Sequence, residues 1–286
     1  MTHLTSTPST RTELPRPISV PNPPQRSSAP ASVISPTAIS PAGPLRYFLE
    51  DDALGKLVRR SLTMLRHVGF YEMCRIHRGP SCISSSVKSI PHPAAPYLDR
   101  LRKCGAPVLQ KTPPWSLPKL RATLNRGCHK SAKNYLHFLR DEMAAMIEAG
   151  HWLVLPATPE ILQLPHLRLS PIGVIPQRER RPRTIVDYSF HGINQDTVSL
   201  APTSMQFGRA FDRFLHRLHH ADSRRGPTFL MKLDLADAFM RVPLQLHSIP
   251  TLGALLPRHP NEPPLIAFPL VLPMGWVDSP PFFCAI

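Results

Sequence analysis

Apolar residues recur at helical spacing near the middle of the chain. Beyond residue 135 they follow one another three and four positions apart, at Leu136, Leu139, Met143, Met146 and Ile147. This period predicts an amphipathic helix with one face in a core. Ser131 or Asn134 can cap its N-terminus, and Gly150 can end it.

Short apolar runs beyond this helix predict strands. One run covers 151–156, and another covers 265–270. Residues 172–175 and 183–188 are rich in β-branched side chains and flank a charged turn, which predicts a hairpin. Alternation over 229–235 predicts a further strand. Its two faces would carry Phe229, Met231, Leu233 and Leu235 on one side and Lys232 and Asp234 on the other.

Two more helices are predicted from apolar stripes. The first lies within 46–70 and the second runs from about Thr203 to Leu218, with Thr203 or Ser204 as its cap. The second stripe, which we expect to face the core, consists of Phe207, Phe211, Phe214, Leu215 and Leu218. Helices mixed with strands in this order predict an α+β fold.

Composition divides the chain into three parts. The 286 residues include 36 prolines, far above the usual share of about 5%. Residues 1–45 are dominated by Ser, Thr and Pro, and we expect a disordered tail. Residues 46–130 form a basic, partly helical leader, in which 78–120 is expected to be a linker without persistent structure. Residues 131–286 are expected to hold the folded domain.

A net charge of +15 and a pI near 10.3 favour a polyanionic partner, most simply nucleic acid, although the charge could merely aid solubility. The five cysteines are an odd set without a Cys-x-x-Cys pair, which indicates a reducing compartment. The spacing of Cys74, His77 and Cys82 matches no familiar zinc site, so we interpret the three as ordinary side chains and not as metal ligands. Because there is neither an apolar signal core nor a run of about 18 apolar residues, we expect an intracellular protein of cytoplasm or nucleus, neither secreted nor in a membrane.

Three segments in order resemble the polymerase domain of reverse transcriptases. Residues 231–239 (Met-Lys-Leu-Asp-Leu-Ala-Asp-Ala-Phe) are similar to motif A, and 270–283, with Pro-Met-Gly-Trp, to motif B. Upstream, 170–188 is similar to the fingers hairpin. The resemblance covers roughly 135–286 and implies fingers and part of the palm of a right-hand, RNA-directed DNA polymerase from a retrotransposon-like element.

The resemblance assigns motif A to metal and phosphate binding. Asp234 would be the catalytic ligand, with the backbone of Leu235, for two Mg²⁺ ions that stabilise phosphoryl transfer. Asp237 and Ala238 would lie beside the triphosphate. Phe239 stands where the family has a steric gate against ribose. A turn-capping role for Asp234 and simple packing for Phe239 are the alternatives.

Other nucleotide contacts are implied outside motif A. Arg183 matches the fingers arginine that contacts the triphosphate, and Arg178 is a weaker second candidate where relatives carry lysines. Met274 and Gly275 would approach the nucleotide or template, the glycine because it lacks a side chain. Ser279 would cap the motif B helix, with Pro280 in its first turn. Trp276 could equally be core.

The sequence contains no Tyr-x-Asp-Asp segment for the remaining metal-binding carboxylates. We therefore expect an N-terminal fragment, truncated before that motif, that polymerises nothing by itself. Its expected partners are an RNA or DNA template-primer and deoxynucleoside triphosphates. The alternatives are a noncatalytic nucleic-acid-binding remnant and, more weakly supported, a scaffold with disordered arms.

Overall fold

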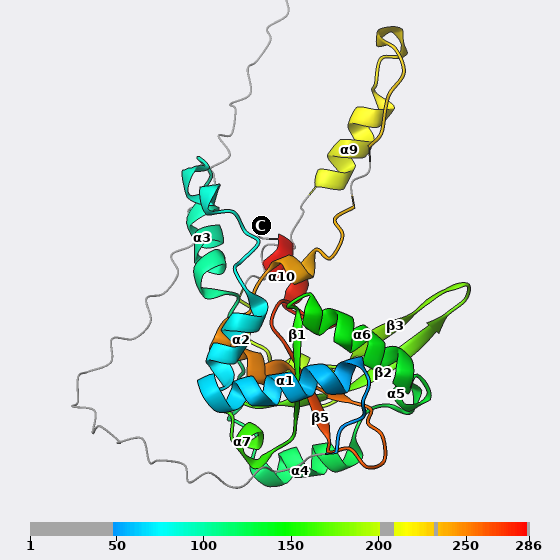
Figure 1. Cartoon of the computed structure of the whole chain (residues 1–286). Helices are drawn as coiled ribbons and strands as arrows, with labels where there is room; N and C mark the ends of the chain where they lie inside the picture. The colour runs from blue at the N-terminus through cyan, green and yellow to red at the C-terminus, as the bar shows by residue number, and fades with distance from the viewer. Residues whose placement is uncertain (1–47, 201–208, 232–233, 285–286) are drawn as a thin grey trace, which may run out of the picture. The chain divides into compact units, whose positions relative to one another are not determined.

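The chain has a mixed α+β fold built around one five-stranded sheet (Figure 1). The computed structural model describes residues 48–200, 209–231 and 234–284, so the tail predicted over 1–45 lies outside the described residues. The sheet has the strand order β1-β5-β4-β2-β3. Its strands are β1 (Trp152–Pro156), β2 (Leu169–Gln177), β3 (Arg180–Val186), β4 (Gly253–Leu256) and β5 (Leu265–Pro269).

Strand β2 pairs with two different strands along its length. Its first part pairs in parallel with β4, with Leu169 opposite Gly253. Its second part pairs antiparallel with β3, with Ile172 opposite Val186. Strand β5 pairs antiparallel with both β1 and β4. The predicted strands at 151–156 and 265–270 and the predicted hairpin are confirmed.

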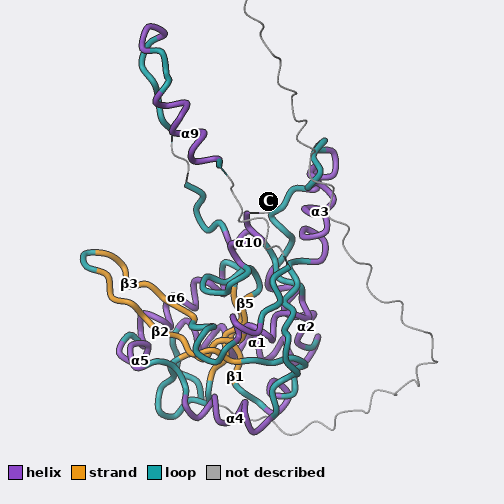
Figure 2. The backbone as a smooth tube through the Cα atoms, turned by 180° about the vertical axis from the view of Figure 1, so that it is seen from behind, coloured by secondary structure: helices purple, strands orange, loops and turns teal. Residues whose placement is uncertain are grey.

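Figure 2 shows the helices in purple and the strands in orange. Among the described residues, every α-helix except α10 comes before β4 in the chain. The α-helices are α1 (Ala53–Val68), α2 (Phe70–Arg78), α3 (Ala95–Cys104), α4 (Leu117–Arg126), α5 (Lys130–Asn134), α6 (Leu136–Glu148), α7 (Pro159–Leu162), α8 (Ile193–Asp196), α9 (Ala210–His219) and α10 (Ser279–Cys284). The 3-10 helices are η1 (Ser85–Ser89), η3 (Ser223–Arg225), η4 (Phe239–Arg241) and η5 (Leu246–Leu252). Within the described part of the chain, none of these helices has both the length and the apolar character needed to span a membrane.

Helices α1 and α6 confirm the two amphipathic patterns upstream of β1. They pack against each other and against β1. The N-terminal capping residues differ from those predicted, because α6 begins after Tyr135 and has no side-chain cap. The prediction for its C-terminus is confirmed: Gly150, with φ +73°, follows the last turn, and its backbone N–H donates to the carbonyl of Ile147 at 2.9 Å. The Ser131 hydroxyl instead accepts a hydrogen bond from the backbone N–H of Val174, at 3.1 Å. It therefore ties the segment before α6 to the hairpin.

The prediction of a structureless linker over 78–120 is wrong. Helix α3, η1 and the start of α4 lie there, and both α-helices carry a proline in the first turn. Proline is tolerated at that position, because the backbone N–H it lacks would have no partner within the helix. Between these helices, the backbone N–H of Ala106 donates to the carbonyl of Pro243 at 2.7 Å. Long-range pairing therefore orders the segment.

The predicted strand over 229–235 is also wrong within the described residues of that stretch. Residues 229–231, 234 and 235 have no regular structure, and Lys232 and Leu233 lie outside the description. A strand needs a neighbour for its backbone groups, and the strand order β1-β5-β4-β2-β3 leaves this segment unpaired. Consequently Phe229 and Met231 are exposed rather than packed.

Helix α9 confirms the later part of the helix predicted over 203–218, whose beginning, with Phe207, lies outside the described residues. Its apolar stripe is not in the core as predicted. Phe211, Phe214, Leu215 and Leu218 are all exposed. Amphipathic spacing predicted the helix, but it could not predict a partner for the helix.

A buried ion-pair network joins three distant segments. Arg140 on α6 has a side chain that is 3% exposed, and it pairs with the fully buried Glu262 at 2.7 Å and with Asp52. Asp52 also caps α1 by accepting from the N–H of Gly55 at 2.7 Å. Glu262 accepts further bonds from the backbone N–H groups of Glu50 and His259, each at 3.0 Å. The network anchors α1 and the β4–β5 connection to α6.

Candidate functional site

A cavity of about 280 Å³ lies where the β2–β3 hairpin meets α6 and the segment after β5. Its wall is mostly apolar, with Met143 and Met146 from α6, Trp152 from β1, and Pro273 and Met274. The hairpin supplies polar side chains, among them Gln177, Arg181, Arg183 and Thr184. An apolar hollow with a few polar groups on one side is the usual form of a small-molecule site.

Arg183 brings the hairpin and the segment after β5 together. Its Nη2 lies 2.8 Å from the Sδ atom of Met274, 91 residues away in the chain. The neighbouring cation, Arg181, is paired with Glu142 on α6 at 2.5 Å. Arg183 has no carboxylate partner among the described residues, so its guanidinium keeps donors for an anionic ligand.

Gly275 is required for the close approach of these two segments. Its backbone has φ +98°, and a Cβ atom at this position would lie 2.7 Å from the carbonyl oxygen of Val186 on β3. Only a residue without a side chain fits such a contact in the left-handed region. In the structure the glycine thus permits contact with β3 of the same chain, and the predicted approach of Gly275 to a nucleotide or template stays a prediction.

A polar network fixes the turn at 273–279. The side chain of Asn194 donates to the carbonyl of Gly275 and accepts from the N–H of Val277, both at 3.0 Å. Buried Asp278 accepts from the Ser199 hydroxyl and from the N–H of Leu200, each at 3.0 Å. Sequence reasoning missed both residues, since nothing local to Asn194 indicates a partner 81 residues away.

The start of α10 agrees in part with its prediction. Ser279 is the first residue of α10, and its hydroxyl donates to the carbonyl of Pro273 at 2.7 Å. Trp276 belongs to the core: it is 1% exposed, stacks on Phe282, and donates through Nε1 to the hydroxyl of Thr197 at 3.1 Å. These contacts hold Met274 at the edge of the cavity.

The motif A residues do not line this cavity. Asp234 and Leu235 are exposed, and neither lies in a strand. Asp237 is exposed in the turn before η4, with φ +53°. Ala238 precedes η4, and Phe239 packs edge-on against Phe283 with ring centroids 5.7 Å apart. Met240, one residue beyond the predicted gate, is the side chain of this segment that reaches the cavity.

Arg178, the second predicted cation, is exposed in the turn between β2 and β3 and does not line the cavity. The structure thus brings together Arg183, Met274 and Gly275, whereas the predicted acidic residues Asp234 and Asp237 do not line the cavity. Within the described ranges, no three His, Cys, Asp or Glu side chains are grouped so that they could hold a metal ion. Asp234 and Asp237 alone do not make up a two-ion ligand set.

Tyr188, directly after the hairpin, is a structural residue. It is fully buried, and its hydroxyl donates to the carbonyl of Leu252 at 3.1 Å. Burial raises the pKa of this phenol well above its ordinary value, so it stays protonated. Tyr188 links the base of the hairpin to the end of η5.

Comparisons with known proteins do not place the chain in a family. No family model matches it, and no curated protein does so either. The site must therefore be interpreted from its own geometry. This geometry is a cation beside an apolar hollow, assembled from the hairpin, α6 and the glycine turn.

Proposed function

We propose that this chain carries the fingers and the first part of the palm of an RNA-directed DNA polymerase, and that the cavity beside Arg183 binds its nucleotide. The observation that carries the proposal is the contact between Arg183 and Met274. The resemblance assigns both residues to one nucleotide, although they are far apart in the sequence.

The cavity suits a deoxynucleoside triphosphate by its distribution of charge. The guanidinium of Arg183 can donate two parallel hydrogen bonds to phosphate oxygens. The apolar wall, with Trp152 and the methionines of α6, can receive the uncharged part of the nucleotide. Arg181 is less suited to the ligand, because Glu142 already neutralises it.

Mg²⁺ remains the proposed cofactor, with Asp234 and the backbone of Leu235 as proposed ligands. The described residues do not provide a two-ion ligand set, so we assign no chemical step to this chain alone. Nucleotide binding, and not polymerisation, is the activity expected of it. A template-primer is the proposed second partner. Asp237, Ala238 and Phe239 do not line the cavity, and their places near the nucleotide stay predictions from the resemblance alone.

Nucleotide binding can be tested on the full chain with a deoxynucleoside triphosphate that carries a fluorophore on its base. Arg183→Ala should weaken binding, measured by anisotropy, about tenfold or more, because a hydrogen bond to a charged group contributes about 1.5–3 kcal/mol. Arg180→Ala is the matched control: it removes the same charge from the exposed end of the same hairpin. Equal losses in the two variants would refute the assignment of the cavity.

The assignment of Asp234 needs a different measurement. Nucleotide affinity should rise with added Mg²⁺, and Asp234→Asn should reduce that dependence while leaving affinity without Mg²⁺ unchanged. Asp222→Asn, on the exposed segment after α9, is the control for loss of one carboxylate. An identical Mg²⁺ response in wild type and Asp234→Asn would rule out Asp234 as a ligand.

A further inference from the structure

The segment around α4 and α5 is strongly basic and contains no acidic residue. Between positions 100 and 140 the sequence has no Asp or Glu. The same stretch contains ten cations: Arg100, Arg102, Lys103, Lys111, Lys119, Arg121, Arg126, Lys130, Lys133 and Arg140. Arg140 is buried in its ion-pair network, whereas those on α4 and α5 are exposed. Such a one-sided charge attracts polyanions.

Four aromatic rings form a continuous row beside these helices. Trp115 precedes α4 and meets His191 edge-on, with ring centroids 5.9 Å apart. His191 meets Phe190 at 4.8 Å, and Phe190 meets His129 at 5.3 Å. Phe190 is 46% exposed, so part of its ring is open to a ligand.

Cations lie directly on this row. The guanidinium of Arg126 covers the face of Phe190 at 3.7 Å from its centroid, and the ammonium of Lys119 lies 4.1 Å from the centroid of Trp115. The pKa of His191 lies below its usual value. Burial is the largest cause, and the positive charges of Arg126 and Lys119 lower it further. Asp187, bonded to His129 at 3.2 Å, is the acidic side chain in contact with the row.

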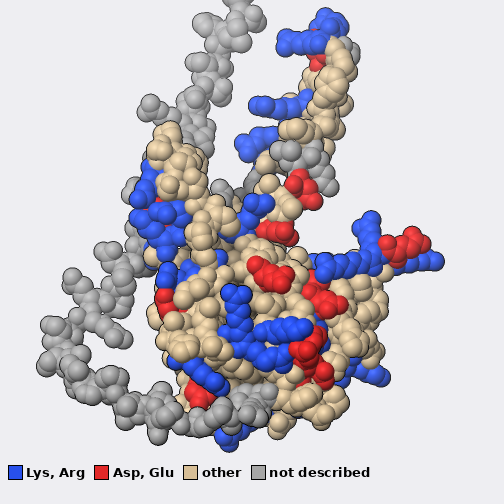
Figure 3. All heavy atoms as spheres, in the orientation of Figure 1, with Lys and Arg blue, Asp and Glu red and all other residues tan. Residues whose placement is uncertain are grey.

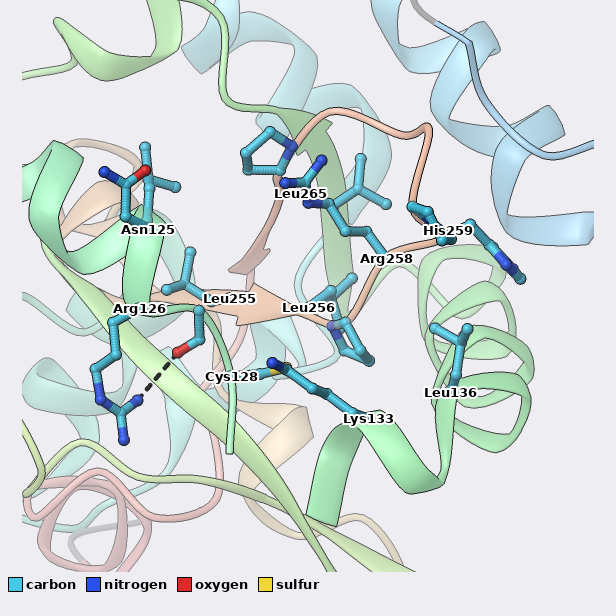
Figure 4. Close-up of a pocket in the computed structure, with 15 residues that line it drawn as sticks. Asn125, Arg126, Cys128, Lys133, Leu136, Leu255, Leu256, Arg258, His259 and Leu265 are labelled. Carbon is cyan, nitrogen blue, oxygen red and sulfur yellow. Dashed lines mark hydrogen bonds between the residues drawn. The ribbon is translucent and has the colours of Figure 1, made fainter. Parts of the chain in front are cut away.

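A hollow of about 340 Å³ continues from the same place (Figure 4). Leu255 and Leu256 of β4 contribute to its apolar lining, and Lys133 and Arg258 extend their charged ends toward it. Arg126 lines the hollow and also lies on the ring row, and its Nη1 donates to the carbonyl of Gly127 at 3.0 Å. The described lining of the hollow contains no carboxylate.

We propose that this surface, formed by Trp115, Lys119, Arg126, His129, Lys133 and Phe190 and called here the basic aromatic surface, binds single-stranded nucleic acid. Bases would stack on the exposed ring of Phe190, on the half-buried rings beside it and on the Arg126 plane, while the cations contact phosphates. A duplex is a poorer ligand, because its bases already stack on one another. The proposal requires no catalysis, and most of the surface lies outside the segment that resembles a polymerase.

The electrostatic part is tested with a fluorescein-labelled oligouridine of about 12 nucleotides and the full chain. Other cations gather near α3 and at the β2–β3 tip (Figure 3), so a charge-matched control is needed. In the triple variant Lys119→Ala, Arg126→Ala, Lys133→Ala, the slope of log K against log salt should become shallower by about 2, since each phosphate contact contributes about 0.7. The control is Lys56→Ala, Arg60→Ala, Arg66→Ala on the exposed side of α1. An equal change in both triples would overturn the proposal.

The stacking part is tested at Phe190, with the fold checked by circular dichroism. Phe190→Leu keeps apolar bulk but removes the ring, and it should weaken oligouridine binding about tenfold at constant salt slope. Phe190→Trp should restore wild-type affinity. An unlabelled duplex of the same length should compete at least tenfold less well than the single strand. Unchanged affinity in Phe190→Leu, or equal competition by the duplex, would exclude a single-strand surface.

Discussion

Replacing Glu262 by glutamine should destabilise the fold far more than the loss of a surface carboxylate. The Glu262 side chain is 0% exposed and accepts from Arg140 at 2.7 and 3.0 Å. Glutamine keeps the shape but removes the charge, and leaves buried Arg140 with Asp52 alone. Breaking a buried pair costs about 3–5 kcal/mol. Because Asp52 still compensates part of the charge, we expect a loss of about 3 kcal/mol in the free energy of unfolding.

Urea denaturation followed by circular dichroism measures this loss. With a slope of about 1–3 kcal/mol per molar, the midpoint should fall by about 1 M or more. Asp51→Asn is the control: its carboxylate is 81% exposed and pairs with Arg59 at 2.8 Å, so the loss should stay below about 1 kcal/mol. Similar midpoints for the two variants would refute the reasoning, because the buried network would then contribute no more than a surface pair.

Three other outcomes are expected from urea midpoints. Burial raises the pKa of Glu262, but the hydrogen bonds that its carboxylate accepts outweigh burial and hold the pKa below its ordinary 4.5. The stability that this carboxylate contributes should therefore be complete above pH 4.5 and decline as pH falls through the lower pKa of the folded state. The decline should be less steep in Glu262→Gln. Gly275→Ala should cost about 1–3 kcal/mol, because its Cβ would meet the Val186 carbonyl at positive φ. Phe214→Ser, at a 48% exposed position, should change stability by less than about 0.5 kcal/mol, whereas Trp276→Ala, 1% exposed, should cost about 3–5 kcal/mol.

Local periodicity predicted those elements whose partners are close in the chain or whose apolar face is buried. Helix α6 and the β2–β3 hairpin are of this kind. The strand predicted over 229–235 failed, because alternation describes which way side chains point but cannot supply a neighbouring backbone. The helices within 78–120 were missed because proline was interpreted as a breaker, although Pro96 and Pro118 lie in the first turns of α3 and α4.

Only those residues of the candidate site that belong to a recognisable motif could be predicted from the sequence. Arg183, Met274 and Gly275 were singled out from the sequence; Arg183 and Met274 line one cavity, and Gly275 packs against Val186 beside it. The roles of Asp234 and Asp237 stay predictions, since neither residue lies at that cavity. Asn194, which fixes the glycine turn by two hydrogen bonds, gave no sequence signal, because its importance comes from contacts more than 80 residues away.

The pairing of strand β2 with both β4 and β3 limits how the hairpin can move. Residues 169–171 are bonded to β4 in the central sheet, and the same strand continues without a break into the hairpin from Ile172. The hairpin, with Arg178 at its tip and Arg183 along β3, is therefore fixed to the central sheet at its base. Movement of the hairpin over a ligand would bend β2 either near Pro171 or at the irregular pairing between Ile175 and Gln177, and a bend near Pro171 would disturb the parallel pairing with β4.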